Sequence, residues 1–233
     1  LGNNRLAIID LSPRGRQPMW DADHQIVVVF NGEIYNFKEL GAELEKKYQF
    51  FSQSDTEVII YAYKEWGIDC LKKFNGIFAL AILDLRAQEL FLARDRVGVN
   101  PLYYYQDEQK FIFSSEIKAI LAHDIPRAVD PEAFNLYFQL LYVPEPHTMF
   151  QGIKKLPSAH YLRFKNNQIN LERYWQVEDF SNLSSYNDAK EQIQTLFRDA
   201  VQKQLISDRP VGIFLSGGMD SSAVLGAVNE FHT

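Results

Sequence analysis

The sequence predicts an α+β fold with antiparallel sheets layered between helices, followed by the start of an α/β unit. Early in the chain, apolar residues recur at helical spacing in two stretches. Short runs of β-branched and aromatic residues, separated by polar turns, then indicate an antiparallel meander. Near the carboxyl end the order becomes apolar strand, glycine-rich turn and helix, which is typical of a parallel α/β unit. We therefore expect domains over residues 1–180 and 188–233.

The composition excludes several classes of protein. Of the 233 residues 46% are hydrophobic, which is enough for the core of a globular protein. The net charge of −6 argues against nucleic acid as a partner. There is no apolar run of about 18 residues and no signal-peptide pattern, so we expect a cytoplasmic protein with no membrane partner. Because Cys70 is the single cysteine, no internal disulfide or cysteine cluster can form, and its apolar neighbours predict a buried packing role.

The strands are predicted from short runs of apolar, β-branched and aromatic residues. The run that ends before Asn31-Gly32 is continuously apolar, which indicates a strand buried on both faces and closed by a tight turn. Asn166-Asn167 is typical of a hairpin turn, and Tyr103-Tyr104-Tyr105 is expected to alternate between core and surface. In order, the expected strands cover 5–10, 25–30, 77–85, 89–94, 101–105, 110–114, 159–164, 168–174 and 211–215.

The helices are predicted from apolar spacing and from their terminal residues. Ser54 and Glu57 have the spacing of a capping box, and Gly67 ends that helix. Pro144 and Pro146 break a later helix, and the polar stretch 181–187 is expected to be the linker between the domains. In order, the expected helices cover 37–48, 55–66, 116–121, 131–141 and 188–206, and a last helix is expected from 221 onward.

The motif that points most directly to chemistry is Ser216-Gly217-Gly218-Met219-Asp220-Ser221-Ser222, which follows the apolar run ending at Leu215. Glycines allow a phosphate to approach the backbone, while hydroxyl and N–H groups at a helix start bind it and a carboxylate can hold Mg²⁺ beside it. The motif lacks the lysine of the Walker loop, which suits pyrophosphate as a leaving group. The alternative is a Ser/Gly turn that caps a helix.

This loop resembles the pyrophosphate loop of the ATP-pyrophosphatase-type synthetases. The upstream segments resemble the class II glutamine amidotransferases, and together the motifs are most similar to the asparagine synthetase family. The resemblance implies an N-terminal-nucleophile amidotransferase fold, joined to the start of a nucleotide-binding domain. The upstream segments are Arg5-Leu6-Ala7-Ile8-Ile9-Asp10, Phe30 to Asn36, Ser54-Asp55-Thr56-Glu57 and Ala93 to Tyr104.

The resemblance assigns roles to six residues of the first domain. The Asn31 side-chain amide and the Gly32 N–H would form an oxyanion hole. Arg5 would bind the α-carboxylate of glutamine, Glu33 and Asp55 would bind its ammonium group, and the Ile9 backbone contributes. Taken singly, these residues have simpler interpretations: Asn31-Gly32 as a turn, Arg5 as a surface charge, Glu33 as a solvated turn residue, and Asp55 as a carboxylate at a helix start.

In the second domain the resemblance implies an ATP site with Mg²⁺ held beside the phosphates by Asp220. The ATP-binding residues would be Leu215, Ser216, Gly217, Gly218, Asp220, Ser221 and Ser222. The histidines show no metal-ligand spacing. Arg94-Asp95-Arg96 corresponds to an architectural segment, and Asn100 stands where the family pattern more often has lysine.

One departure concerns the nucleophile. Amidotransferases of this class use an amino-terminal cysteine, whereas this chain begins at Leu1 and ends at Thr233 within a helical pattern. We therefore expect a piece, inactive by itself, of a longer enzyme that takes ammonia from glutamine and amidates aspartate through a β-aspartyl-adenylate, releasing AMP and pyrophosphate. A homodimer is one assembly that the resemblance allows. The alternatives are a related synthetase with another carboxylate acceptor, a non-catalytic glutamine-binding module, and an interaction scaffold.

Overall fold

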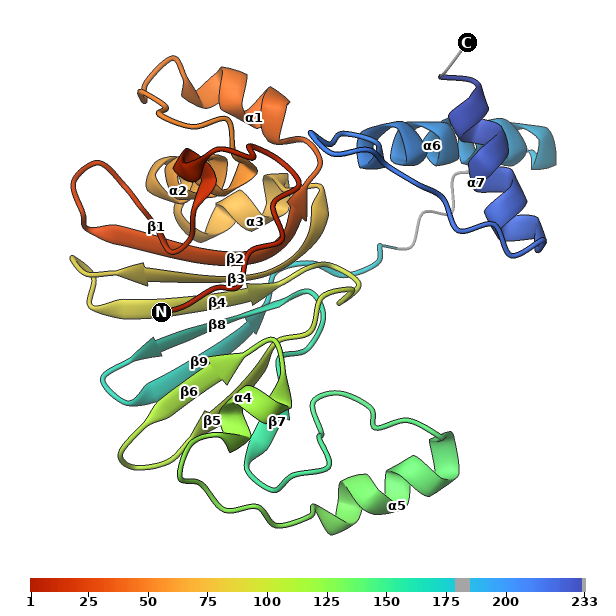
Figure 1. Cartoon of the computed structure of the whole chain (residues 1–233). Helices are drawn as coiled ribbons and strands as arrows, with labels where there is room; N and C mark the ends of the chain where they lie inside the picture. Colours follow the sequence, from red (N-terminus) through yellow and green to blue (C-terminus); the bar gives the residue numbers. More distant parts are fainter. Residues whose placement is uncertain (179–184, 232–233) are drawn as a thin grey trace.

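A computed structural model describes residues 1–178, here called the first unit, and 185–231, the second unit. Figure 1 shows the elements along the chain. They are η1 (Pro13–Gly15), β1 (Met19–Trp20), β2 (Ile26–Ile34), α1 (Phe37–Leu44), α2 (Asp55–Trp66), η2 (Gly67–Asp69), α3 (Cys70–Lys73), β3 (Gly76–Asp84), β4 (Glu89–Arg94), β5 (Tyr103–Gln106), β6 (Phe111–Ser114), α4 (Ile117–Leu121), α5 (Pro131–Leu140), β7 (Ile153–Lys155), β8 (His160–Lys165), β9 (Gln168–Arg173), α6 (Tyr186–Gln204) and α7 (Met219–Asn229).

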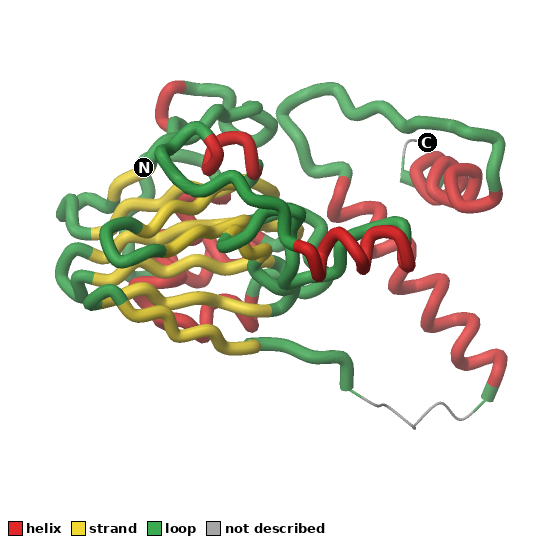
Figure 2. The backbone as a smooth tube through the Cα atoms, turned by 90° about the horizontal axis from the view of Figure 1, so that it is seen from below, coloured by secondary structure: helices red, strands yellow, loops and turns green. Residues whose placement is uncertain are grey.

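The first unit consists of stacked helices and sheets (Figure 1). Helices α1, α2 and α3 cover one face of a six-stranded antiparallel sheet with the order β1-β2-β3-β4-β8-β9. A three-stranded sheet, β6-β5-β7, packs on the other face, and α4 lies against it. Figure 2, seen from below, shows α6 and α7 to one side of these layers. The predicted α+β class, with antiparallel sheets between helices, is confirmed.

Strand β2 shows why its sequence is continuously apolar. Val28 and Phe30 face the helices, whereas Val29 faces the second sheet. Because successive side chains of a strand point to opposite faces, a strand covered on both sides needs apolar residues at every position. The strand is longer than predicted, since it continues through Asn31-Gly32 to Ile34. The turn interpretation of Asn31-Gly32 is therefore wrong.

The expected strand at 5–10 is absent, because this segment folds back on itself. The Arg5 guanidinium donates to the carbonyl oxygens of Ile9 and Asp10, and Asp10 has a φ of 54°. Such a left-handed residue interrupts an extended strand. Instead, the two residues of β1 pair with β2, with Met19 opposite Val28.

The expected meander divides between the two sheets. Strands β3 and β4 pair in the six-stranded sheet, whereas β5 and β6 pair in the smaller one. Tyr104 and Tyr105 are both buried, in different clusters, because core lies on each face of β5. Their expected alternation between core and surface is therefore wrong. The hairpin of β8 and β9 is confirmed, with φ of 51° at Asn166 and 58° at Asn167 as a type I′ turn requires.

The helix termini mostly follow the sequence signals. Ser54 caps α2 by accepting a hydrogen bond from the N–H of Thr56, and Gly67 ends the helix with a φ of 57°. The capping box is not completed, because the Glu57 carboxylate accepts hydrogen bonds from the N–H groups of Phe51 and Ser52 instead. Helix α1 ends at Leu44, earlier than predicted, and α5 ends at Leu140, before the prolines.

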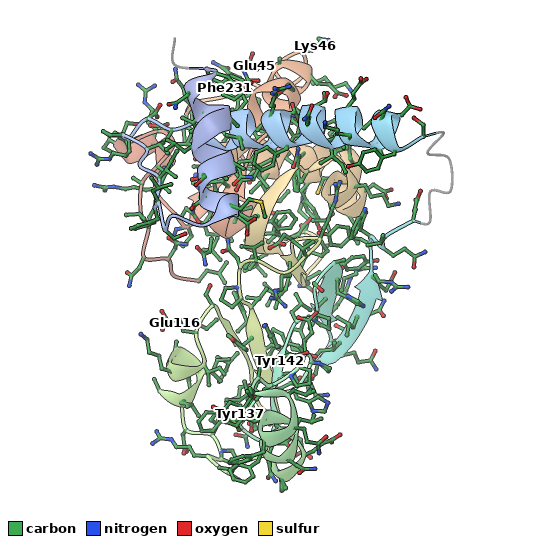
Figure 3. All side chains as sticks on the ribbon, turned by 90° about the vertical axis from the view of Figure 1, so that its right-hand side faces the viewer. Glu45, Lys46, Glu116, Tyr137, Tyr142 and Phe231 are labelled. Carbon is green, nitrogen blue, oxygen red and sulfur yellow. The ribbon has the colours of Figure 1, made fainter. Side chains whose placement is uncertain are left out.

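In the second unit, α6 packs against α7 through a small apolar cluster that includes Val201, Ala227 and Val228. The predicted strand at 211–215 is not formed, since no strand among residues 1–178 and 185–231 pairs with this segment. Most of the linker predicted at 181–187 lies outside the described residues, and its last two residues begin α6. Figure 3 shows Tyr137 and Tyr142, in the α5 region, at the opposite end of the molecule from Phe231.

Candidate functional site

A cavity of about 290 Å³, here called the Arg5 cavity, lies where the amino-terminal segment meets β2 and the start of α2. It gathers the residues to which the sequence assigned roles in the first domain, although they come from separate segments of the chain. Its lining includes Arg5, Ile9, Asn31, Gly32, Glu33 and Asp55.

Gly32 lets β2 and β3 approach closely at the cavity. Its φ is +145°, and a Cβ atom built on it would lie 2.0 Å from the Ile77 carbonyl oxygen and 2.8 Å from Phe78 Cα. Neither backbone atom can yield without disturbing the ladder, in which Gly32 pairs with Phe78. The position therefore requires glycine, because of sheet packing rather than because of a hairpin turn.

Asn31 lines the cavity next to Gly32 and is exposed. Its side-chain amide donates a long hydrogen bond of 3.4 Å to the Ser115 hydroxyl. Its carbonyl accepts a hydrogen bond of 2.8 Å from the side-chain amide of Asn100, which also lines the cavity. The Asn100 side chain thus holds the backbone of β2 at Asn31.

The Arg5 guanidinium is held by backbone groups and is not a free surface charge. One of its terminal nitrogens donates to the carbonyl oxygens of both Ile9 and Asp10, and its hydrogen bond to Asp10 measures 3.0 Å. Gly15 lies directly behind the group, since a Cβ atom there would be 2.6 Å from that nitrogen. The guanidinium is thereby fixed at the cavity, where it can bind a carboxylate.

Asp55, the first residue of α2, is buried, with 5% of its surface exposed. Burial raises its pKa to about 6, although hydrogen bonds from the N–H groups of Ile34 and Thr56 and from Ser54, together with the charge of Arg5, oppose this rise. The bond from Ile34 measures 3.2 Å and fixes the carboxylate against β2. Asp55 is therefore a buried carboxylate that is held against β2, and its interpretation as only a carboxylate at a helix start is incomplete.

Glu33 places a second carboxylate at the cavity. Its pKa is raised, first by burial and then by repulsion from Asp55. Glu33 lies within strand β2 and is half-buried, so it is not the solvated turn residue of the simpler interpretation. Two partly desolvated carboxylates facing one cavity with a guanidinium form a site that is complementary to the ammonium and carboxylate groups of an α-amino acid.

Sequence reasoning missed two residues that shape the cavity. The Gln17 side chain accepts a 2.6 Å hydrogen bond from the Phe30 N–H and donates at 3.4 Å to the Thr56 hydroxyl, so it ties β2 to α2. Asn3 donates at 3.2 Å to the Phe30 carbonyl, and its buried Oδ1 has no partner among the described residues. No local signal marks either residue, because both act through contacts between segments that are distant in sequence.

In the second unit, the loop before α7 is closed by its own serines. The hydroxyls of Ser216 and Ser221 lie 3.1 Å apart, and the Gly218 N–H donates to the Ser216 hydroxyl at 3.3 Å. Ser222 donates at 2.8 Å to the Gly218 carbonyl. Gly217 has a φ of 79°, which favours glycine. The loop therefore gathers hydroxyl and N–H groups at the start of α7, where groups of this kind can bind phosphate.

Asp220 lies in the first turn of α7 and, like Leu215, is exposed. Mg²⁺ bound to polyphosphate needs one or two carboxylates besides phosphate oxygens and water, so this single carboxylate fits that ion. Within the described part of the chain, no group of three or more His, Cys, Asp and Glu side chains could hold a metal by itself. None of the described helices is long and apolar enough to cross a membrane.

Two sequence-based expectations outside the cavity are confirmed. Cys70 is fully buried in the apolar core between the helices and the six-stranded sheet, and burial strongly raises the pKa of its thiol. Arg94 is architectural, since it is 2% exposed and donates to the Asn100 carbonyl at 2.7 Å, the Leu156 carbonyl at 2.8 Å and Glu145 at 2.7 Å.

Comparison with known proteins identifies both units. A family model described as a glutamine amidotransferase domain matches residues 1–175. A second model, described as asparagine synthase, matches residues 192–233.

Curated relatives align over nearly the whole chain. Glutamine-hydrolyzing asparagine synthetase 3 of Bacillus subtilis is 45% identical over 229 residues, which cover 96% of this chain and 37% of the relative. A putative asparagine synthetase of Methanocaldococcus jannaschii is 39% identical, with 99% of this chain and 48% of the relative covered. A Gibberella zeae protein named amidase chry2 is 36% identical, with coverages of 99% and 35%. The chain thus spans less than half the length of each of these relatives.

Among solved structures, the fold matches the glutamine phosphoribosylpyrophosphate amidotransferase of B. subtilis, with a TM-score of 0.51 and 17% identity. The match covers 94% of this chain and 48% of that one. This likeness confirms that the first unit has the fold of a glutamine amidotransferase, as predicted.

Proposed function

This chain belongs to the glutamine amidotransferase family and continues into the start of an asparagine synthase domain. We therefore propose that the Arg5 cavity binds glutamine for hydrolysis. The observation that carries the proposal is the convergence of Arg5, Glu33 and Asp55 on one cavity beside Asn31-Gly32. The guanidinium would bind the α-carboxylate of glutamine, and the two carboxylates would bind its ammonium group. The contact with the ammonium group is stronger when the two carboxylates are ionised.

For the hydrolysis we propose the covalent route of this enzyme class. A cysteine thiolate adds to the carboxamide carbon of glutamine, ammonia leaves, and water hydrolyses the resulting thioester to glutamate. Donation from the Asn31 amide and the Gly32 N–H would stabilise the oxyanion of each tetrahedral intermediate. Cys70 does not supply the thiolate, because it is buried in the core with a raised pKa.

For the complete enzyme we propose that the ammonia is used to make asparagine. The side-chain carboxylate of aspartate would attack the α-phosphorus of ATP and release pyrophosphate, and ammonia would then displace AMP from the β-aspartyl-adenylate. The serine and glycine groups of the 215–222 loop would hold the pyrophosphate, and Asp220 would help to hold Mg²⁺, which neutralises phosphate charge when bound.

A second candidate is a synthetase of the same architecture with another carboxylate acceptor. It is favoured by the 36% identity to a protein named amidase chry2. An experiment has to decide between aspartate and another acceptor.

That experiment uses the full-length protein with ATP, Mg²⁺, aspartate and glutamine labelled with ¹⁵N in the amide. Mass spectrometry should find ¹⁵N-asparagine and AMP in equal amounts. Release of labelled ammonia without asparagine or AMP would contradict aspartate as the acceptor. Synthesis from ammonium chloride but not from glutamine would contradict the role of the Arg5 cavity.

A further inference from the structure

The two units are joined by a contact at Asp208, which follows α6. The Asp208 N–H donates to the Ile8 carbonyl at 2.9 Å, and its carboxylate accepts a 2.7 Å hydrogen bond from the Asp10 N–H. Ile206, two residues earlier, packs against the core of the first unit. A groove of about 540 Å³ is lined by the segment 205–208 together with residues of α1 and of the 50–54 loop. Glu45, which also lines this groove, lies at the same end of the molecule as Phe231 (Figure 3).

The backbone that Asp208 holds is the backbone that fixes Arg5. The carbonyl oxygens of Ile9 and Asp10 accept the hydrogen bonds of the guanidinium. The Asp10 side chain also accepts a 2.9 Å hydrogen bond from the Gln53 N–H, two residues before Asp55. Both charged ends of the glutamine site are therefore connected to the segment 8–10, and that segment is held in place by Asp208.

Asp208 is also close to the phosphate loop along the chain. Ser216 lies eight positions after Asp208, and the structure places no helix or strand between them. A fully extended segment of this length spans at most about 29 Å. Asp208 and the loop therefore belong to one short connecting segment, so an ordering of the loop around polyphosphate can change the position of Asp208.

We infer that Asp208 is a positioning residue for the Arg5 cavity and that it couples occupancy of the phosphate loop to glutamine binding. The inference rests on the proposed function. By linkage, a ligand at the loop that favours one arrangement of Asp208 changes glutamine affinity, and glutamine changes the affinity of that ligand by the same factor. Asp208 itself touches neither substrate.

The test compares Asp208→Ala with Asp208→Asn in the full-length enzyme. Alanine leaves the Asp10 N–H without its acceptor, so the KM for glutamine should rise about tenfold, with kcat for glutamine hydrolysis changed less than about twofold. Asparagine retains an acceptor oxygen and should restore most of the affinity. Synthesis from ammonium chloride, which bypasses the Arg5 cavity, should stay within about twofold of the wild-type rate in both variants.

Asp199→Asn is the matched control, because the Asp199 carboxylate pairs with Lys203 on α6 and makes no contact with the first unit. In the wild type, the KM for glutamine should differ between samples with and without ATP, Mg²⁺ and aspartate, and this difference should disappear in Asp208→Ala. If Asp208→Ala does not fold, Asp208→Glu, which displaces the carboxylate by one methylene, should show the same shift in reduced form.

Three results would overturn the inference: an unchanged KM for glutamine in Asp208→Ala, an equal loss of ammonia-dependent synthesis, or a wild-type KM that does not respond to ATP and aspartate. A wild-type enzyme that makes asparagine from ammonium but does not hydrolyse glutamine would instead refute the proposed function. The two failures are therefore distinguishable.

Discussion

Replacing Asp55 with asparagine should stabilise the fold at neutral pH while weakening glutamine binding. The pKa of Asp55 is raised from 3.8 to about 6 by burial, with the opposing hydrogen bonds and the attraction of Arg5 already included. Well below pH 3.8 the carboxyl is neutral in both the folded and the unfolded chain, so it imposes no penalty. As the pH rises, the unfolded chain ionises first, and above the folded pKa the native state bears the full penalty. At about 1.4 kcal/mol for each pKa unit, this penalty is about 3 kcal/mol.

Asparagine has a similar shape and can still accept the hydrogen bond from the Ile34 N–H, so Asp55→Asn should be up to ~3 kcal/mol more stable than the wild type at pH 8. The difference should fall below ~1 kcal/mol at pH 4 and vanish below about pH 3. Urea unfolding followed by tryptophan fluorescence measures it, because Trp20, Trp66 and Trp175 all lie in the first unit. A variant that is less stable at pH 8, or a stability difference that does not change with pH, would refute the reasoning.

Four further predictions follow from the contacts described above. Gly15→Ala should raise the KM for glutamine about tenfold, because the new Cβ displaces the Arg5 guanidinium from its place at the cavity, and it should lower the unfolding free energy by less than ~1 kcal/mol; an unchanged KM would contradict the placement of that group. Arg94→Lys should lower the unfolding free energy in urea by ~3 kcal/mol, since an ammonium cannot replace the buried forked contacts, and a loss below ~1 kcal/mol would show that those contacts matter little. A thiol reagent should label Cys70 only after unfolding, because the thiol is buried and its pKa is raised; rapid labelling of the native chain would count against this burial. Gly32→Ala should lower the unfolding free energy by more than ~3 kcal/mol, owing to the clash with the Ile77 carbonyl, and a normal urea midpoint would disprove that clash.

The sequence predicted much of the fold because local signals were consistent with tertiary packing. The continuously apolar run in β2 indicated a strand covered on both faces, and Ser54 and Gly67 marked the ends of α2. The error at 5–10 arose because β-branched residues favour a strand only where a partner strand is available, and here the Arg5 contacts fold the segment back. The strand predicted at 211–215 is absent for a related reason, since no described strand lies beside this segment.

For the candidate site, the sequence identified the charged groups but not the residues that hold them in position. Arg5, Glu33 and Asp55 were found through motif resemblance, and the structure brings them to one cavity. Asn31-Gly32 illustrates the limit of local reasoning, because the dipeptide that most often makes a tight turn here lies within a strand, where backbone crowding requires the glycine. Gln17 carries no local signal, since it acts by joining β2 to α2.

The claim that the Arg5 cavity recognises both ends of glutamine is tested most directly by calorimetric titration of the full-length protein with three ligands at pH 8. These are L-glutamine, glutaramate, which lacks the α-amino group, and 4-aminobutanamide, which lacks the α-carboxylate. The account predicts that both analogues bind at least ~10-fold more weakly than glutamine, and that Asp55→Asn narrows the gap for glutaramate while Arg5→Met narrows it for 4-aminobutanamide. Equal binding of the three ligands, or gaps that neither variant changes, would contradict it.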